Sequence, residues 1–164
     1  MLLLVFTIDE QRYALHLHAV ERVASAVEVT PLPKAPEIVH GVVNVQGRVI
    51  PVVNIRKRFR LPEKETDLSD QLIIANTSKR PVALLTDGAS GVIEQFEEGV
   101  VTSEEILPGM EYVEGVVKLE DGMILIHNLD KFLSLEEEET ISNQLSEINK
   151  QQSTSMEQGL EGGK

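Results

Sequence analysis

The feature that most constrains the fold is a series of short aliphatic runs, each ended by turn-forming residues. Only 4% of the 164 residues are aromatic and none is Trp, so the core must be built from Val, Ile and Leu. Short runs rich in β-branched residues, spaced by about ten positions, predict the strands of a barrel or sandwich. We expect strands at 2–8, 12–17, 22–30, 40–46, 48–55, 71–77, 81–86, 89–96, 112–119 and 122–128.

An internal repeat divides this all-β pattern into two similar parts. Residues 41–59 resemble residues 115–133 at an offset of 74, since Gly41 aligns with Gly115. Each copy is expected to form a hairpin with a tight turn, followed by a segment with charged residues. Two equivalent hairpins favour two small sheets, each closing to hide its edges. The alternative is that any two apolar hairpins align this well. The other identical pairs are Val42/Val116, Val43/Val117, Ile50/Ile124, Asn54/Asn128 and Lys57/Lys131.

The C-terminal part of the chain has a helical pattern. Ser134 and Glu137 match a capping box, and an amphipathic helix is expected over 134–150. Its apolar stripe consists of Ile141, Leu145 and Ile148. Residues 151–164 are polar and rich in glycine, which predicts disorder. Short helical turns are also expected at 18–22, 36–39 and 103–106.

Composition excludes several functional classes. The formal charge of −12 argues against nucleic-acid binding, because phosphate contacts need clustered Lys and Arg. The one basic cluster, residues 56–60, is better explained as the solvated end of a buried strand. The absence of Cys excludes disulfides and thiolate chemistry and suits a reducing cytosol. The apolar run 2–6 is too short to span a membrane, so no membrane insertion is expected.

No combination of residues predicts an active site, a metal site or a cofactor. His16 and His18 share one face of a strand, but the sequence nominates no third ligand for a metal. Ser90 lacks a nominated base, and Gly88 and Gly91 fit a turn better than a phosphate-binding loop. Carboxylates are abundant without a recognisable cleft. A hydrolase or small-ligand binding protein that uses a groove between the two parts stays as the alternative.

Several separated motifs resemble those of CheW domains. Residues 31–59, PLPKAPEIVHGVVNVQGRVIPVVNIRKRF, are similar to the family signature, in which a G-[VI]-[VI]-N-[LV]-R-G turn precedes an apolar strand and [DN]-[LI]-R. LLLVFTIDEQRYALHL resembles the opening hairpin, with Tyr13-Ala14-Leu15 at its usual place. PVALLTDGASGVIE resembles the V-D-x-V-x-x-V segment of the family, with Asp87 as its aspartate. YVEGVVKLEDGMILIHNLDKFLS resembles the closing hairpin.

This resemblance covers residues 2–135 and implies two five-stranded β-barrels with a groove between them and a short C-terminal helix. We expect one domain over 1–135, with intertwined halves near 1–65 and 66–135. The family implies a non-catalytic cytoplasmic adaptor that bridges chemoreceptor tips and the regulatory domain of a CheA-type histidine kinase. The alternatives are a scaffold for a non-chemotactic sensory array or a small-ligand binding protein.

An adaptor of this kind needs exposed apolar edges with polar flanks on a rigid scaffold. About half of the valines in any such strand must face inward, because side chains alternate. Candidate interaction residues are Val20, Arg22, Val23, Ala24, Asn44, Gln46, Gly47, Arg48, Val92 and Ile93.

Two candidates depart from the family pattern. Arg22 stands where Glu is typical, and Gln46 stands where Arg is typical. Family members pair these two positions as ions near the receptor-facing surface, so this chain has lost both charges. We predict that Arg22 and Gln46 face each other and act together as a specificity element.

Overall fold

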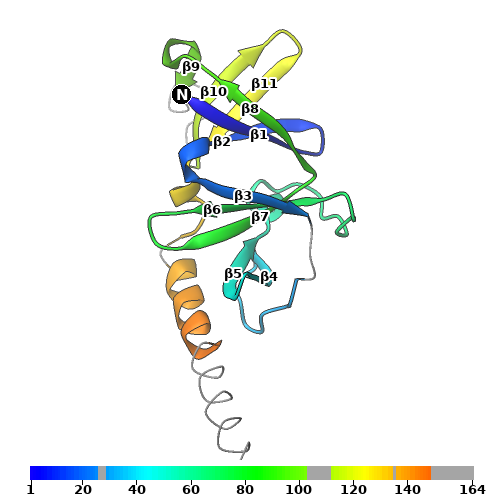
Figure 1. Cartoon of the computed structure of the whole chain (residues 1–164), viewed down its shortest axis with the longest axis vertical. Coiled ribbons are helices and arrows are strands. Elements are labelled where there is room, and N and C mark those ends of the chain that lie inside the picture. Colours follow the sequence, from blue (N-terminus) through cyan, green and yellow to red (C-terminus); the bar gives the residue numbers. More distant parts are fainter. Residues whose placement is uncertain (26–28, 103–111, 135, 149–164) are drawn as a thin grey trace, which may run out of the picture.

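Two β-sheets form the body of the computed structural model, which describes residues 1–25, 29–102, 112–134 and 136–148 (Figure 1). The larger sheet has the strand order β8-β1-β2-β11-β10-β9, and the smaller has the order β3-β6-β7-β5-β4. The larger sheet comprises β1 (Leu2–Ile8), β2 (Gln11–His16), β8 (Gly88–Glu94), β9 (Val100–Thr102), β10 (Val113–Leu119) and β11 (Gly122–His127). The smaller comprises β3 (Val20–Ser25), β4 (Val39–Val45), β5 (Arg48–Val53), β6 (Gln71–Asn76) and β7 (Pro81–Thr86).

Short helical segments connect these strands and follow the hairpins. They are η1 (Leu17–Ala19), α1 (Ile55–Arg58), η2 (Glu97–Gly99) and η3 (Leu129–Lys131). The expected all-β fold of two subdomains with a C-terminal helix is confirmed. The larger sheet has six strands where five were expected, because the three-residue strand β9 pairs with β10. Residues 26–28 of the expected strand 22–30 and the expected turn at 103–106 lie outside the described residues.

The 74-residue repeat is present in the fold. The hairpins β4-β5 and β10-β11 occupy equivalent positions in their sheets, and β4 and β10 have the same sequence of buried and exposed residues. Each hairpin has a register shift at its start, at Val39/Gly41 and at Val113/Gly115. These shared irregularities make the hairpins structurally equivalent, beyond a chance alignment of two apolar segments.

The two sheets are intertwined along the chain. The chain enters the smaller sheet after β2 and returns to the larger sheet after β7, so β8 joins a sheet begun by β1. All of residues 20–86 that form strands lie in the smaller sheet. The expected boundary near residue 65 therefore does not separate the two sheets.

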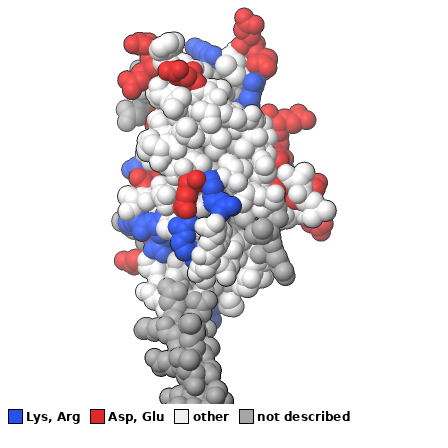
Figure 2. Space-filling model, viewed as in Figure 1, with Lys and Arg blue, Asp and Glu red and all other residues white. Residues whose placement is uncertain are grey.

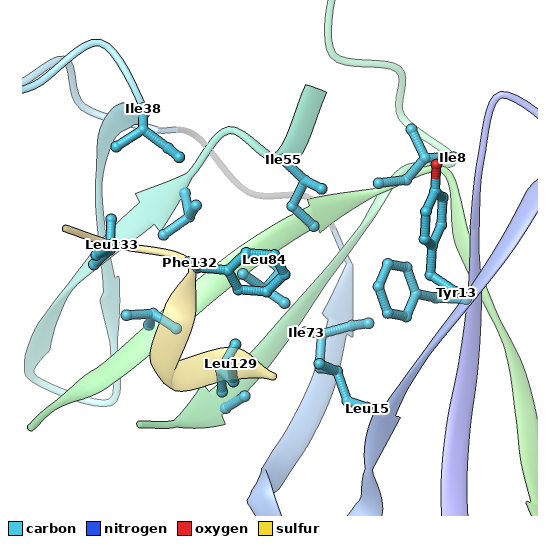
Figure 3. Close-up of a cluster of buried hydrophobic side chains, with 14 of the residues drawn as sticks. Ile8, Tyr13, Leu15, Ile38, Ile55, Ile73, Leu84, Leu129, Phe132 and Leu133 are labelled. Carbon is cyan, nitrogen blue, oxygen red and sulfur yellow. The ribbon is translucent and has the colours of Figure 1, made fainter. Parts of the chain in front are cut away.

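A shared core joins the subdomains. One face of β1 and β2 packs against one face of β6 and β7, with the segment after β11 closing the side (Figure 3). Fully burying one such side chain contributes roughly 1.5–3 kcal/mol, so separating the sheets would cost several times that amount. The residues labelled in Figure 3 are Ile8, Tyr13, Leu15, Ile38, Ile55, Ile73, Leu84, Leu129, Phe132 and Leu133.

The C-terminal helix, described over 136–148, packs onto this core beside the smaller sheet (Figure 1). The predicted capping box is present, because Ser134 N donates to Glu137 Oε1 at 2.7 Å and Glu137 N donates to Ser134 Oγ at 3.1 Å. Ile141 is completely buried, and Arg80 Nε donates to Glu138 Oε2 at 2.9 Å. The predicted helix end at 149–150 and the tail 151–164 lie outside the described residues.

Candidate functional site

The first set of predicted interaction residues lies on β3, an edge strand of the smaller sheet. Arg22 and Val23 are exposed, whereas Val20 packs partly against the shared core. A register shift between Val20 and Arg22 interrupts the pairing with β6. Ala24 is half-buried opposite Leu72, on the face of the sheet away from the shared core. The exposed part of this candidate set is therefore Arg22 and Val23.

The second set forms the tip of the β4-β5 hairpin. Gln46 and Gly47 have φ values of 53° and 84°, and Asn44 Oδ1 accepts a hydrogen bond from Gly47 N at 2.9 Å. Both turn residues thus lie in the left-handed region, which is the conformation of a two-residue type I′ turn. The hairpin with a tight turn that the repeat predicts is therefore present here, and Arg48, which is exposed, begins β5 after the turn.

An ion pair brings the hairpin tip to β3. The guanidinium of Arg48 donates to the carboxylate of Glu21. Among the described residues, Arg22 and Gln46 form no side-chain hydrogen bond or ion pair with each other. The charge pair at this surface therefore connects positions 21 and 48. Sequence reasoning missed Glu21, although its charge is opposite to that of Arg48.

The third set lies on β8, the edge strand of the larger sheet. Val92 is 51% exposed, whereas Ile93 pairs with Leu3 and packs onto the interior of the larger sheet. Val92 lies opposite Leu4, on the face of the sheet that turns toward the smaller subdomain. Only Val92 of this pair is available as a surface contact.

A partly buried charge cluster connects the subdomains where sequence analysis expected a solvated strand end. Arg56 exposes only 12% of its side chain and binds Asp9 and Asp87, each through contacts of 2.8–2.9 Å. Arg58 also pairs with a carboxylate, that of Glu137 at 2.6 Å. The interpretation as a solvated strand end is wrong for Arg56 and Arg58, because both are largely covered and ion-paired, whereas Lys57 and Arg60 are exposed as expected.

The histidines do not form a metal site in the described residues, where no group of three His, Cys, Asp or Glu side chains could hold an ion. His16 Nε2 binds the Glu114 carboxylate, and its ring lies 5.4 Å from that of His18. Both histidines border a hollow of about 400 Å³ between the subdomains. No helix within the described ranges has the length and apolar composition needed to cross a bilayer.

Comparisons with known proteins agree with these features. A family model described as a CheW-like domain matches residues 2–144. The chemotaxis protein CheW of Thermotoga maritima is 32% identical over 130 residues, covering 79% of this chain and 85% of that protein. The namesake protein of Treponema pallidum is 26% identical over 147 residues, covering 86% of each chain. The crystal structure of the scaffolding protein TtCheW from Thermoanaerobacter tengcongensis is similar, with 27% identity, a TM-score of 0.75, and coverage of 83% and 94% of the respective chains.

Proposed function

Because this chain belongs to the CheW-like family, whose named relatives are chemotaxis scaffolds, we propose that it couples chemoreceptors to a CheA-type histidine kinase. The observation that carries this proposal is the extent of the family match, which includes both sheets and most of the described helix. Family membership also confirms the expectation of a non-catalytic scaffold. The adaptor would act in the cytoplasm, held at receptor arrays by its partners.

The edges β3 and β8 are the best supported receptor-facing surface. They belong to different sheets, yet both approach Gln71, which pairs with Ser25 of β3 and accepts a hydrogen bond from Ala89 N of β8 at 2.8 Å. Val23 and Val92 are respectively 36% and 51% exposed, and each pairs with a residue of the shared core. Exposed apolar residues at two neighbouring edges suit a partner that lies across both subdomains.

Charge on the same side of the molecule favours an acidic partner. The chain as a whole is acidic, but Figure 2 shows Lys and Arg side chains gathered over the smaller subdomain, with Asp and Glu mainly toward the upper and right margins. Arg48 is neutralised by Glu21, whereas Arg22 has no ion-pair partner among the described residues. We propose that Arg22 pairs with a carboxylate of the receptor and thereby contributes to partner choice, since charges at a rim fix register.

Titration calorimetry tests the coupling function. We expect the regulatory domain of the CheA-type kinase of the host to bind in the micromolar range, equivalent to about −8 kcal/mol. The cytoplasmic tip of a chemoreceptor should bind the same protein without displacing the kinase domain. If no kinase or receptor of the host forms a complex, the proposed function is wrong.

Substitutions at the two edges test the surface. Val23→Asp and Val92→Asp should each weaken receptor binding by at least tenfold, because a buried unpaired carboxylate would enter the interface. Met123→Asp is the matched control, since Met123 is 50% exposed but lies on β11, in the β10-β11 hairpin, away from both edges β3 and β8. Equal binding by all three variants would move the receptor site away from β3 and β8.

A further inference from the structure

Arg56 makes an ionic clasp between the subdomains. It belongs to α1, which follows strand β5 of the smaller sheet, and its Nη1 donates to both carboxylate oxygens of Asp9 at 2.8 Å. Asp9 lies in the turn between β1 and β2 of the larger sheet. The Nη2 atom of Arg56 donates to the two carboxylate oxygens of Asp87 at 2.9 and 3.2 Å. A fifth hydrogen bond, of 3.1 Å, goes from Nη1 to Pro62 O.

Asp87 is itself the point at which the chain crosses between the sheets. It is the single residue between β7 and β8. Its N–H donates to Thr7 O at 3.0 Å, and its carboxylate accepts from Asp9 N at 2.8 Å. Burial raises the pKa of Asp87, but the Asp9 N–H and the Arg56 guanidinium outweigh it and hold the pKa below its ordinary value. Asp87 is therefore ionised at neutral pH, and its bonds to Arg56 are charge-assisted.

The clasp lies at the start of β8. Two residues beyond Asp87, Ala89 N is bound to Gln71, which in turn pairs with the end of β3. Contacts in an apolar core are non-directional, whereas bidentate Arg–carboxylate bonds fix an orientation. Asp87 thus fixes the direction in which the chain passes from β7 of the smaller sheet into β8 of the larger sheet.

The internal repeat supplies a comparison within the same molecule. Position 130 is equivalent to position 56 at the offset of 74, and Asp130 also reaches the opposite subdomain. Its carboxylate accepts a single hydrogen bond, from Ser78 N in the β6-β7 turn at 2.7 Å. Each hairpin exit therefore contacts a turn of the other subdomain. Arg56 donates two hydrogen bonds to Asp9 and two to Asp87, whereas Asp130 accepts one.

We propose that Arg56 is a positioning residue that sets β8 at a fixed angle to β3, so that a partner spanning both edges meets a preformed surface. This rests on the proposed receptor-coupling function for its binding consequence. Loss of the clasp leaves the shared core intact but widens the range of angles between the sheets. A partner that contacts both subdomains then pays for ordering them when it binds.

Spin-label distance measurements test the clasp without any partner. The chain has no Cys, so labels at Met123→Cys in the larger sheet and Lys79→Cys in the smaller are unambiguous. We expect the distance distribution to broaden in Arg56→Ala and to be only partly restored in Arg56→Lys, which keeps the charge but loses the bidentate geometry. Arg12→Ala is the control, because Arg12 binds Asp121 at 2.9 Å within the larger sheet. If Arg56→Ala does not fold, Asp87→Asn removes the same charge pair.

Binding measurements then test the consequence. Arg56→Ala should weaken binding of the receptor tip by at least tenfold, while Arg12→Ala changes it by less than twofold, both measured where circular dichroism shows a folded protein. An unchanged distance distribution in Arg56→Ala and Asp87→Asn overturns the clasp. A broadened distribution with unchanged binding overturns the preformed surface. If wild-type protein binds no receptor, the coupling function fails, and the distance measurement still decides the clasp.

Discussion

His127 should make the protein less stable as the pH falls from 7 to 5. Its side chain is 1% exposed, and neither ring nitrogen has a hydrogen-bond partner within the described residues. The ring is packed among aromatic side chains, 4.7 Å from Phe59 and 5.3 Å from Phe132. Burial lowers the pKa of His127 to about 3, against a smaller opposite effect of the Tyr112 backbone. The folded protein therefore holds this imidazole neutral.

The direction of this change in stability follows from proton uptake by the folded and unfolded states. An unfolded chain binds a proton at His127 with a pKa of about 6.5, while the folded chain binds it only near pH 3. Below pH 6.5 the unfolded state gains protons that the folded state does not, so stability falls as the pH falls. Between pH 7 and pH 5 the free energy of unfolding should drop by about 2 kcal/mol from this residue alone.

Urea denaturation of wild type and His127→Phe at pH 7 and pH 5 measures this effect. Phe keeps a ring in the aromatic cluster but cannot be protonated, so the variant should lose about 2 kcal/mol less than wild type between the two pH values. His127→Val, which copies the equivalent residue Val53 of the first repeat, provides a second variant if Phe does not fit. His18→Phe is the control, because it removes an exposed imidazole in place of a buried one. Equal pH dependence in wild type and both His127 variants would show that this imidazole is solvated or partnered.

Three further outcomes are expected. Gly47→Val should lower the free energy of unfolding by about 1–3 kcal/mol, because φ is 84° there, whereas Gly47→Asn should lower it much less. Equal stabilities of the two variants, measured by denaturation, would contradict the turn assignment. Deletion from Ser134 onward should lower the melting temperature, since it removes buried Ile141 and the partner of Arg80, while deletion of 151–164 should not; an undocked helix would give equal melting temperatures. In double-mutant cycles on stability, Glu21→Gln with Arg48→Gln should couple by about 0.2–1 kcal/mol, whereas Arg22→Gln with Gln46→Ala should be additive. The reverse result would support the pairing of Arg22 with Gln46 that was predicted from the sequence.

Local patterns in the sequence were sufficient for most of the fold. The hairpins, the turn at Gly47 and the capping box at Ser134 each depend on residues within a few positions of one another, so their signals are contained in short segments. Strand β9 was missed because three residues, Val100–Thr102, are too few to show an alternating pattern. It exists through its pairing with β10, which is a tertiary contact.

The candidate site was harder to predict for the same reason. Alternation says that half of the apolar residues face inward, but which of Val92 and Ile93 does so depends on the pairing of β8 with β1. The ion partner of Arg48 lies 27 positions away at Glu21, and those of Arg56 lie 47 and 31 positions away. Charges at such separations meet only once the topology is known.

Comparing the two copies of the internal repeat distinguishes residues that form the fold from residues that form its interfaces and surfaces. Where the copies agree, as at Asn54 and Asn128, the side chains do the same local work, since each caps the helical segment after its hairpin. Where the copies differ at Arg56 and Asp130, the residues lie at the interface between subdomains and give it unequal ends. The hairpin tips differ as well, with Gln46-Gly47 in one copy and Glu120-Asp121 in the other. Two copies of one hairpin can therefore fold alike and still carry different charges at their tips, which is compatible with the proposed coupling of two unlike partners.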